Sequence, residues 1–229
     1  MGCIVFKTRF QNGLRVLGVS RMTIEMSHKL TNITSKPFDN KHIKKIMDSY
    51  INKVNYNKKG IVKFCDPFAN ESFTNFLQGC ITNDLNKEFN TNYNLEFKDF
   101  AAIMNDLNHS FDIIFFDPPY SLRQLKENYD GIGKDLELWQ THNMWKEGKN
   151  SLAPLVKIGG YVISFGWTSS GFGKKRGFKK VAVHLFEQAA REDRYDLIMT
   201  IEQKVQSTLI PFINSKEPAK PGCLKQGSD

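Results

Sequence analysis

Short β-type runs that alternate with helical segments constrain the fold of this chain more than any other feature. The clearest run is Phe111–Phe116, which is apolar except for one aspartate and stops at two prolines. Apolar residues recur at helical spacing between Asp39 and Val54, which predicts a helix with Asp39 as its N-cap. The alternation predicts an α/β fold, in which a mainly parallel sheet carries helices on both faces.

Shorter patterns predict the remaining elements. Further strands are expected at 61–65, 80–82, 95–97 and 161–165, and a hairpin at 181–186 and 195–202. Further helices are expected at 72–77, 87–93, 100–108 and 136–156, with a polar loop at 121–135. We therefore expect an N-terminal extension at 1–35, one domain at 36–205 and a flexible tail at 206–229.

The composition limits the partners and the setting. A net charge of +8 favours a polyanionic partner such as nucleic acid. No apolar run is long enough to span a bilayer, so no membrane partner is expected. The 4 cysteines form no C-x-x-C pair and no His–Cys cluster, which predicts a reducing, cytosolic setting and no metal.

Carboxylates follow several of the expected strands. In open α/β sheets, ligands bind at the carboxyl ends of the strands, near the point where the strand order reverses. We therefore expect one crevice to be faced by the side chains of Asp66, Asp84, Asp99 and Asp117.

The segment after the clearest strand is the strongest candidate for chemistry. It reads Asp117-Pro118-Pro119-Tyr120 and is called the tetrapeptide below. An aromatic amino group attacks carbon poorly because its lone pair is shared with the ring. The Asp117 carboxylate and the Pro118 carbonyl could accept its two hydrogens and free that lone pair, and proline has no N–H to compete. Tyr120 can stack on a base turned out of a duplex. The alternative interpretation is a plain strand-ending turn.

This tetrapeptide resembles motif IV of the amino-methyltransferases, the family that makes N6-methyladenine and N4-methylcytosine. The likeness covers about residues 34–205 and is strongest to N6-adenine DNA methyltransferases, including small orphan enzymes of phages and prophages. It implies a Rossmann-like class I methyltransferase fold, with a mainly parallel seven-stranded sheet and a C-terminal antiparallel hairpin. It also implies S-adenosyl-L-methionine as cofactor and DNA as partner.

Two further segments resemble cofactor-binding motifs of this family. Lys36-Pro37-Phe38 resembles motif X, which flanks the cofactor, and Asp66-Pro67-Phe68 resembles motif I, which lines its methionine part. Motif I normally continues with glycines, whereas this chain continues with Ala69-Asn70. The resemblance therefore leaves two alternatives, a looser backbone approach to the cofactor or a hydrogen bond from Asn70.

Two more positions match acidic motifs of the family. Asp84 matches the acid expected on the ribose hydroxyls and lies near the spacing usual for such acids. Asp99-Phe100 resembles motif III, which contacts the cofactor's adenine.

Two segments are candidates for nucleic-acid binding. No separate recognition domain is evident, so residues 121–134 are expected to read bases through Arg123, Gln124 and Lys126. A basic cluster is expected to contact phosphates beside the base pocket rather than to be only a solvated loop, and it consists of Lys174, Lys175, Arg176, Lys179 and Lys180.

Other functions stay open at this point. RNA amino-methyltransferases also use this tetrapeptide, and a catalytically silent nucleic-acid-binding module could keep the same fold. N4-cytosine methylation more often accompanies serine at the first position of the motif. Methylation of protein glutamine accompanies Asn-Pro-Pro-Tyr, against which Asp117 argues.

Overall fold

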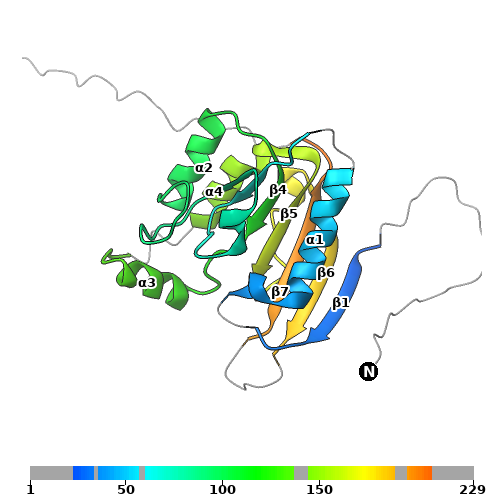
Figure 1. The fold of residues 1–229 in the computed structure, drawn as a ribbon, viewed down its shortest axis with the longest axis horizontal. Coiled ribbons are helices and arrows are strands. Elements are labelled where there is room, and N and C mark those ends of the chain that lie inside the picture. The colour runs from blue at the N-terminus through cyan, green and yellow to red at the C-terminus, as the bar shows by residue number, and fades with distance from the viewer. Residues whose placement is uncertain (1–22, 34–35, 57–59, 137–143, 189–194, 208–229) are drawn as a thin grey trace, which may run out of the picture.

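The computed structural model describes residues 23–33, 36–56, 60–136, 144–188 and 195–207, and the account below concerns these residues. Their strands form one sheet, with helices on both sides (Figure 1). The strands lie in the order β1-β6-β7-β5-β4-β2-β3. Their bounds are β1 Glu25–Leu30, β2 Phe64–Asp66, β3 Cys80–Thr82, β4 Phe111–Phe116, β5 Val156–Gly166, β6 Phe178–Glu187 and β7 Leu197–Lys204.

The sheet is parallel except at β7. Strand β7 pairs antiparallel with both β5 and β6, and every other pairing is parallel. The predicted α/β class, the seven-stranded sheet and the C-terminal hairpin are thus confirmed. Because β3 lies on one side of β2 and β4 on the other, the strand order reverses between β2 and β4.

Helix α1 (Lys41–Tyr56) covers one face of the sheet. Its Ile43 and Met47 are buried in a cluster with residues of β4, β5, β6 and β7. The helix follows a short 3₁₀ turn, η1 (Pro37–Asp39), and its cap differs from the prediction. Asn40, not Asp39, caps the helix, because its Oδ1 accepts the His42 N–H at 2.9 Å.

Helices α2 (Phe97–Asp106) and α4 (Met144–Leu152) cover the other face. The predicted strand at 95–97 is wrong, because α2 already begins at Phe97. The helix buries residues at i, i+3, i+4 and i+7, namely Phe97, Phe100, Ala101 and Met104. That helical stripe outweighs the short β-type run before it.

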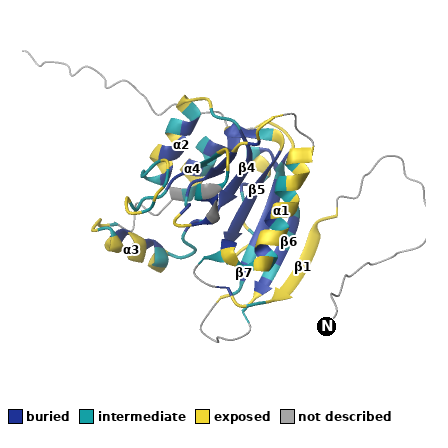
Figure 2. Cartoon of the chain, viewed as in Figure 1, coloured by how far each residue is buried: buried dark blue, intermediate teal, exposed yellow. Residues whose placement is uncertain are grey.

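The seventh strand comes from the segment predicted to be an extension. Strand β1 pairs with β6 at the edge of the sheet, and all of its residues are exposed (Figure 2). An exposed strand needs no alternation of apolar and polar residues, so the sequence showed no periodicity there. Strand β4 is the opposite case, since every one of its residues is buried.

Three smaller predictions are also corrected. Residues 87–93 form turns rather than a helix, and Asn92 Oδ1 accepts the Thr82 N–H at 2.8 Å there. Residues 72–77 form only the 3₁₀ turn η2 (Phe73–Phe76). The predicted loop at 121–135 contains helix α3 (Leu122–Gly131), because Ser121 is an N-cap whose Oγ accepts the Gln124 N–H at 3.1 Å.

Short 3₁₀ turns complete the fold, and part of one prediction falls outside the described ranges. The helix predicted at 136–156 is seen only as α4 and the turn η4 (Ala153–Leu155), because residues 137–143 lie outside the described ranges. A further turn, η5 (Lys174–Arg176), precedes β6. No helix within the described ranges is long and apolar enough to cross a membrane.

Candidate active site

A cavity of about 1510 Å³ lies at the carboxyl ends of β2, β3 and β4. Its walls come from the segments that follow these three strands, from η1, from the start of α2 and from α3. The predicted crevice is therefore present, at the point where the strand order reverses. Of the four carboxylates expected there, Asp84 and Asp117 line it, whereas Asp66 and Asp99 do not.

Asp66 holds the turn after β2 instead of lining the cavity. It is fully buried, its Oδ1 accepts the Phe68 N–H at 3.0 Å, and its Oδ2 accepts the Thr74 hydroxyl at 2.8 Å. Burial raises the pKa of Asp66 to about 7, although both hydrogen bonds lower it. The turn that it orders brings Pro67 and Phe68 to the cavity wall.

Asn70 replaces a glycine in this turn by adopting the conformation that glycine favours. Its φ is +48°, in the left-handed region that asparagine tolerates better than most residues. Its backbone N–H donates to Asp84 Oδ2 at 3.0 Å, and its side-chain oxygen accepts the Glu71 N–H at 2.6 Å. The side chain thus hydrogen-bonds the chain itself, and the backbone keeps a tight turn without glycine.

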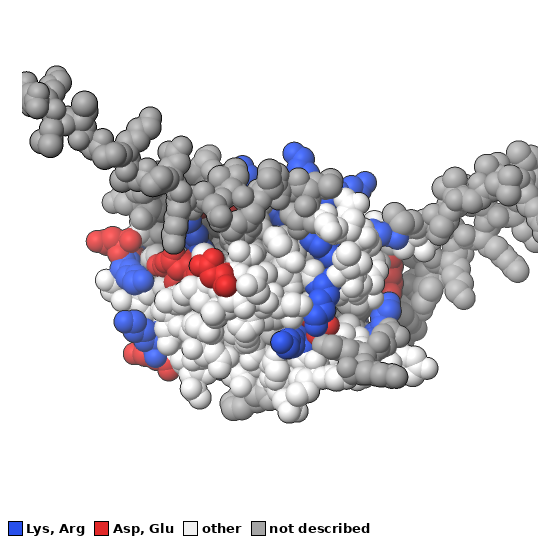
Figure 3. Space-filling view, turned by 90° about the horizontal axis from the view of Figure 1, so that it is seen from above, with Lys and Arg blue, Asp and Glu red and all other residues white. Residues whose placement is uncertain are grey.

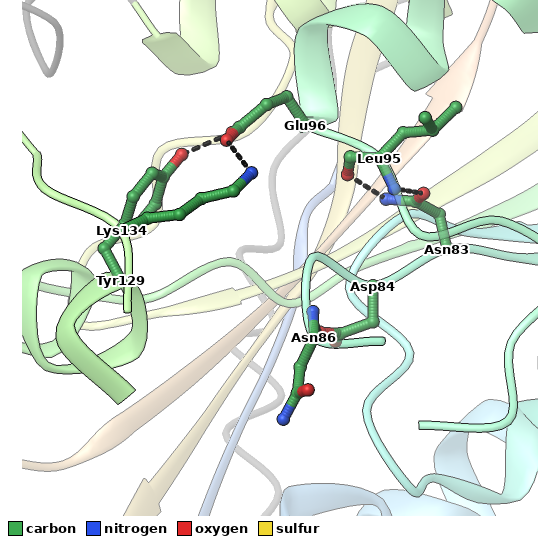
Figure 4. Close-up of polar contacts among 7 residues, drawn as sticks. All are labelled: Asn83, Asp84, Asn86, Leu95, Glu96, Tyr129 and Lys134. Atoms are coloured by element: carbon green, nitrogen blue, oxygen red, sulfur yellow. Dashed lines mark hydrogen bonds and ion pairs between the residues drawn. The ribbon is translucent and has the colours of Figure 1, made fainter. Parts of the chain in front are cut away.

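Asp84 joins the turn after β2 to the end of β3. Besides the Asn70 N–H, its carboxylate accepts the Asn86 N–H at 2.9 Å (Figure 4). Burial raises its pKa, and the backbone donors lower it. Asp84 is therefore an oriented acceptor on the cavity wall, as a ligand hydroxyl would require.

The tetrapeptide follows β4 and all four of its residues line the cavity. The Tyr120 hydroxyl donates to Asp117 Oδ1, and the Tyr120 N–H donates to Gln124 Oε1 at 2.8 Å. Burial raises the pKa of Asp117 to about 7, and the Tyr120 hydrogen bond lowers it in part. The Tyr120 hydroxyl thus orients the Asp117 carboxylate.

Aromatic side chains extend the wall beside the tetrapeptide. The Trp167 and Tyr120 rings lie edge to face with centroids 6.0 Å apart. The Tyr195 ring also packs on Trp167, and these two centroids are 4.2 Å apart. Trp167 is not among the site residues expected from the sequence. Its position directly after β5, at the carboxyl end, was the available indication.

Glu96 is a cavity residue that the sequence did not indicate. Its carboxylate accepts the Tyr129 hydroxyl of α3 and lies 3.2 Å from Lys134 Nζ (Figure 4). The predicted pair Asp99-Phe100 lies elsewhere, since Asp99 is exposed on α2 and Phe100 is buried in the core. In their place, the cavity is lined by Leu95, Glu96 and Phe97.

The segment resembling motif X also lines the cavity. Lys36 Nζ lies 2.8 Å from Glu71 Oε2, which ties η1 to the turn after β2. Phe38 is buried and packs edge to face on Phe165 at 5.1 Å. Pro37 begins the 3₁₀ turn between them.

The segment expected to read bases is only partly at the cavity. Arg123 and Gln124 line it, whereas Lys126 does not. Arg123 Nε lies 2.8 Å from Glu127 Oε1, and Lys126 Nζ lies 3.0 Å from Asp130 Oδ2, both as exposed pairs along α3. Exposed pairs of this spacing contribute little and can be exchanged for phosphate contacts.

The predicted position of the basic cluster is wrong. Phe178, at the start of β6, pairs with Lys204 at the end of β7, so the cluster lies where the parallel strands begin. Arg176 is occupied within the fold, because its Nη1 donates to the Phe172 carbonyl at 2.7 Å. Figure 3 looks onto this edge of the molecule and shows basic side chains in small groups among acidic ones. None of the five residues lines the cavity: Lys174, Lys175, Arg176, Lys179 and Lys180.

The family of the chain follows from comparison with known sequences. The model of the D12 class N6 adenine-specific DNA methyltransferases matches residues 49–164, which is more than half of the chain and includes β2 to β4 and the tetrapeptide. The chain belongs to this family. Comparison with curated proteins found no significant match.

Several solved structures are similar to this D12-class chain at low sequence identity. TrmN from Thermus thermophilus is 11% identical, with a TM-score of 0.44, and the match covers 69% of this chain and 48% of TrmN. An rRNA methylase from Streptococcus thermophilus is 10% identical over 70% of this chain and 96% of its own, with a TM-score of 0.43. The N-methyltransferase NodS from Bradyrhizobium japonicum WM9, in complex with S-adenosyl-L-homocysteine, is 10% identical over 76% and 94%, with a TM-score of 0.44.

The cavity of the D12-class chain fits the family's cofactor, S-adenosyl-L-methionine. Asp84 offers a carboxylate for ribose hydroxyls, and the turn at Pro67 and Phe68 offers an apolar wall. The described residues include no group of three His, Cys, Asp or Glu side chains that could hold a metal ion.

Proposed function

We propose that this methyltransferase transfers the methyl group of S-adenosyl-L-methionine to the exocyclic N6 of adenine in DNA. One observation carries the proposal. Asp84, suited to the cofactor's ribose, and the tetrapeptide, suited to an aromatic amino group, line the same cavity. The family to which the chain belongs supports adenine and DNA as the target.

The tetrapeptide supplies the acceptors for the amino group. When bound, the cofactor supplies an electrophilic methyl group on a sulfonium. Asp117 and the Pro118 carbonyl accept hydrogen bonds from the two amino hydrogens, which frees the nitrogen lone pair for in-line attack. The nitrogen–methyl bond forms as the sulfur–methyl bond breaks, and the methylated nitrogen then loses one proton to solvent. These hydrogen bonds strengthen as the nitrogen gains positive charge, so Asp117 acts mainly in the transition state.

Access to adenine N6 requires that the base leave the duplex. A base inside the stack cannot reach a cavity at the end of a sheet, so we infer that it is flipped out. Tyr120 and Trp167 offer aromatic faces at the cavity wall for such a base. The Tyr120 hydroxyl donates to Asp117 Oδ1, and the second carboxylate oxygen can still accept a hydrogen bond from the amino group.

The test is transfer of labelled methyl groups to DNA and, separately, to RNA. Asp117→Ala should lower the turnover number about 10²–10³-fold, as expected for loss of a preorganised acceptor. Cofactor affinity, measured by calorimetry, should stay within about twofold because Asp117 faces the target and not the ribose.

Nucleoside analysis of the product identifies the target atom. N6-methyladenine in DNA is the expected product. Methylated RNA only, N4-methylcytosine, or no transfer by a protein that binds the cofactor would each contradict the proposal.

A further inference from the structure

The Gln124 side chain points at the backbone of the tetrapeptide. The Gln124 Oε1 accepts the Tyr120 N–H at 2.8 Å, and the Gln124 backbone N–H donates to Ser121 Oγ at 3.1 Å. These two bonds join the end of the tetrapeptide to the first turn of α3. The first bond resembles the reciprocal bond of a capping box, displaced by one residue toward the N-terminus.

The Tyr120 N–H differs from the rest of the tetrapeptide because the two residues before it have no backbone donor. Pro118 and Pro119 have no N–H, so Tyr120 carries the first backbone donor after Asp117. Left without a partner, this donor would compete for the acceptors that an amino group needs. Bound to Gln124, it is not available to those acceptors.

The same bond also fixes the Tyr120 side chain. The Tyr120 ring lies edge to face with Trp167, and its hydroxyl donates to Asp117. A backbone held at Tyr120 therefore sets both the aromatic face and the orientation of the carboxylate. A shift of about 1 Å at such a group can lower a rate about 10²-fold.

We propose that Gln124 is a positioning residue for methyl transfer, which holds the tetrapeptide through the Tyr120 N–H and does not read a base. The proposal rests on the proposed function and replaces the role that the sequence suggested for Gln124. It predicts that loss of the acceptor lowers turnover while the methylated sequence stays the same.

Two matched substitutions separate the acceptor from the rest of the side chain. Gln124→Met keeps the length and the helix propensity but has no oxygen, and Gln124→Glu keeps the acceptor. Leu122→Ala, at an exposed residue of the same helical turn outside the cavity, controls for general effects on α3.

We expect loss of the acceptor to lower kcat without changing KM for the cofactor or the methylated sequence. Gln124→Met should lower kcat about 10–100-fold, with KM for cofactor and the methylated sequence unchanged. Gln124→Glu should stay within about threefold of the wild type. Hydrogen exchange at the Tyr120 N–H should accelerate in Gln124→Met and stay slow in Gln124→Glu and Leu122→Ala.

Two results would overturn the proposal. One is a Gln124→Met protein with normal kcat and normal exchange at the Tyr120 N–H. The other is a changed methylated sequence, which would assign Gln124 to base reading. Failure of the proposed function itself would appear in the nature of the product, and the exchange measurement does not depend on that product.

Discussion

At the scale of single residues, we expect Asp117 to make the rate of methyl transfer depend on pH. Its pKa is raised to about 7 by burial, so the carboxylate loses its charge as pH falls through that value. The ionised form is the better acceptor for the amino group, and we expect kcat to fall about tenfold per pH unit below about pH 7. Asp66 has a similar raised pKa, so a control is needed. In Asp117→Asn the residual rate should be flat with pH, whereas a slope that persists in this variant would assign the titration to another group.

At the scale of elements, α3 forms one wall of the cavity, and we expect this wall to move when ligands enter and leave. Glu96, at the start of α2, holds the buried Tyr129 of α3 and the exposed Lys134, which follows shortly after α3 ends. Removing one partner of a buried hydroxyl costs about 1–3 kcal/mol, so Glu96→Ala should loosen α3. We expect faster hydrogen exchange throughout α3 and a cofactor dissociation rate raised about 3–10-fold in stopped-flow measurements. Glu147→Ala, which breaks the exposed Lys98–Glu147 pair between α2 and α4, should change neither. Equal effects of both variants would argue against α3 as a wall that opens.

At the scale of the whole molecule, the net charge of +8 attracts a polyanion, but the position of each charge decides its contribution. Lys174 and Lys175 lie at the edge where the parallel strands begin, away from the cavity. Replacing both with Gln should therefore leave the salt dependence of DNA binding nearly unchanged. Arg123→Ala, at the cavity wall, should either reduce the slope of log binding constant against log salt concentration by about one, as for one lost phosphate contact, or lower the selectivity for the methylated sequence. Titration of DNA at several salt concentrations tests both, and a larger change of slope in the lysine variant would move the DNA to the opposite edge.

The sequence by itself determined the features that depend on near neighbours in the chain. Apolar residues at nearly every position of Phe111–Phe116 require burial on both faces, and the two prolines after Asp117 end the strand wherever it lies. The helical spacing of Ile43 and Met47 likewise predicts α1 from its own residues. The class of fold and the position of the tetrapeptide at the end of a buried strand were therefore predictable.

Only the tertiary structure decided which distant side chains meet. The direction of β6 places the basic cluster at the far edge, and no local pattern contains that direction. The contact of Glu96 with Tyr129 and Lys134 joins residues more than thirty positions apart. Gln124 lies close in sequence to its partner, yet its acceptor role depends on the cap that starts α3. Local propensity acts over a few residues, whereas strand order and chain direction, set by packing of the whole sheet, determine what surrounds the cavity.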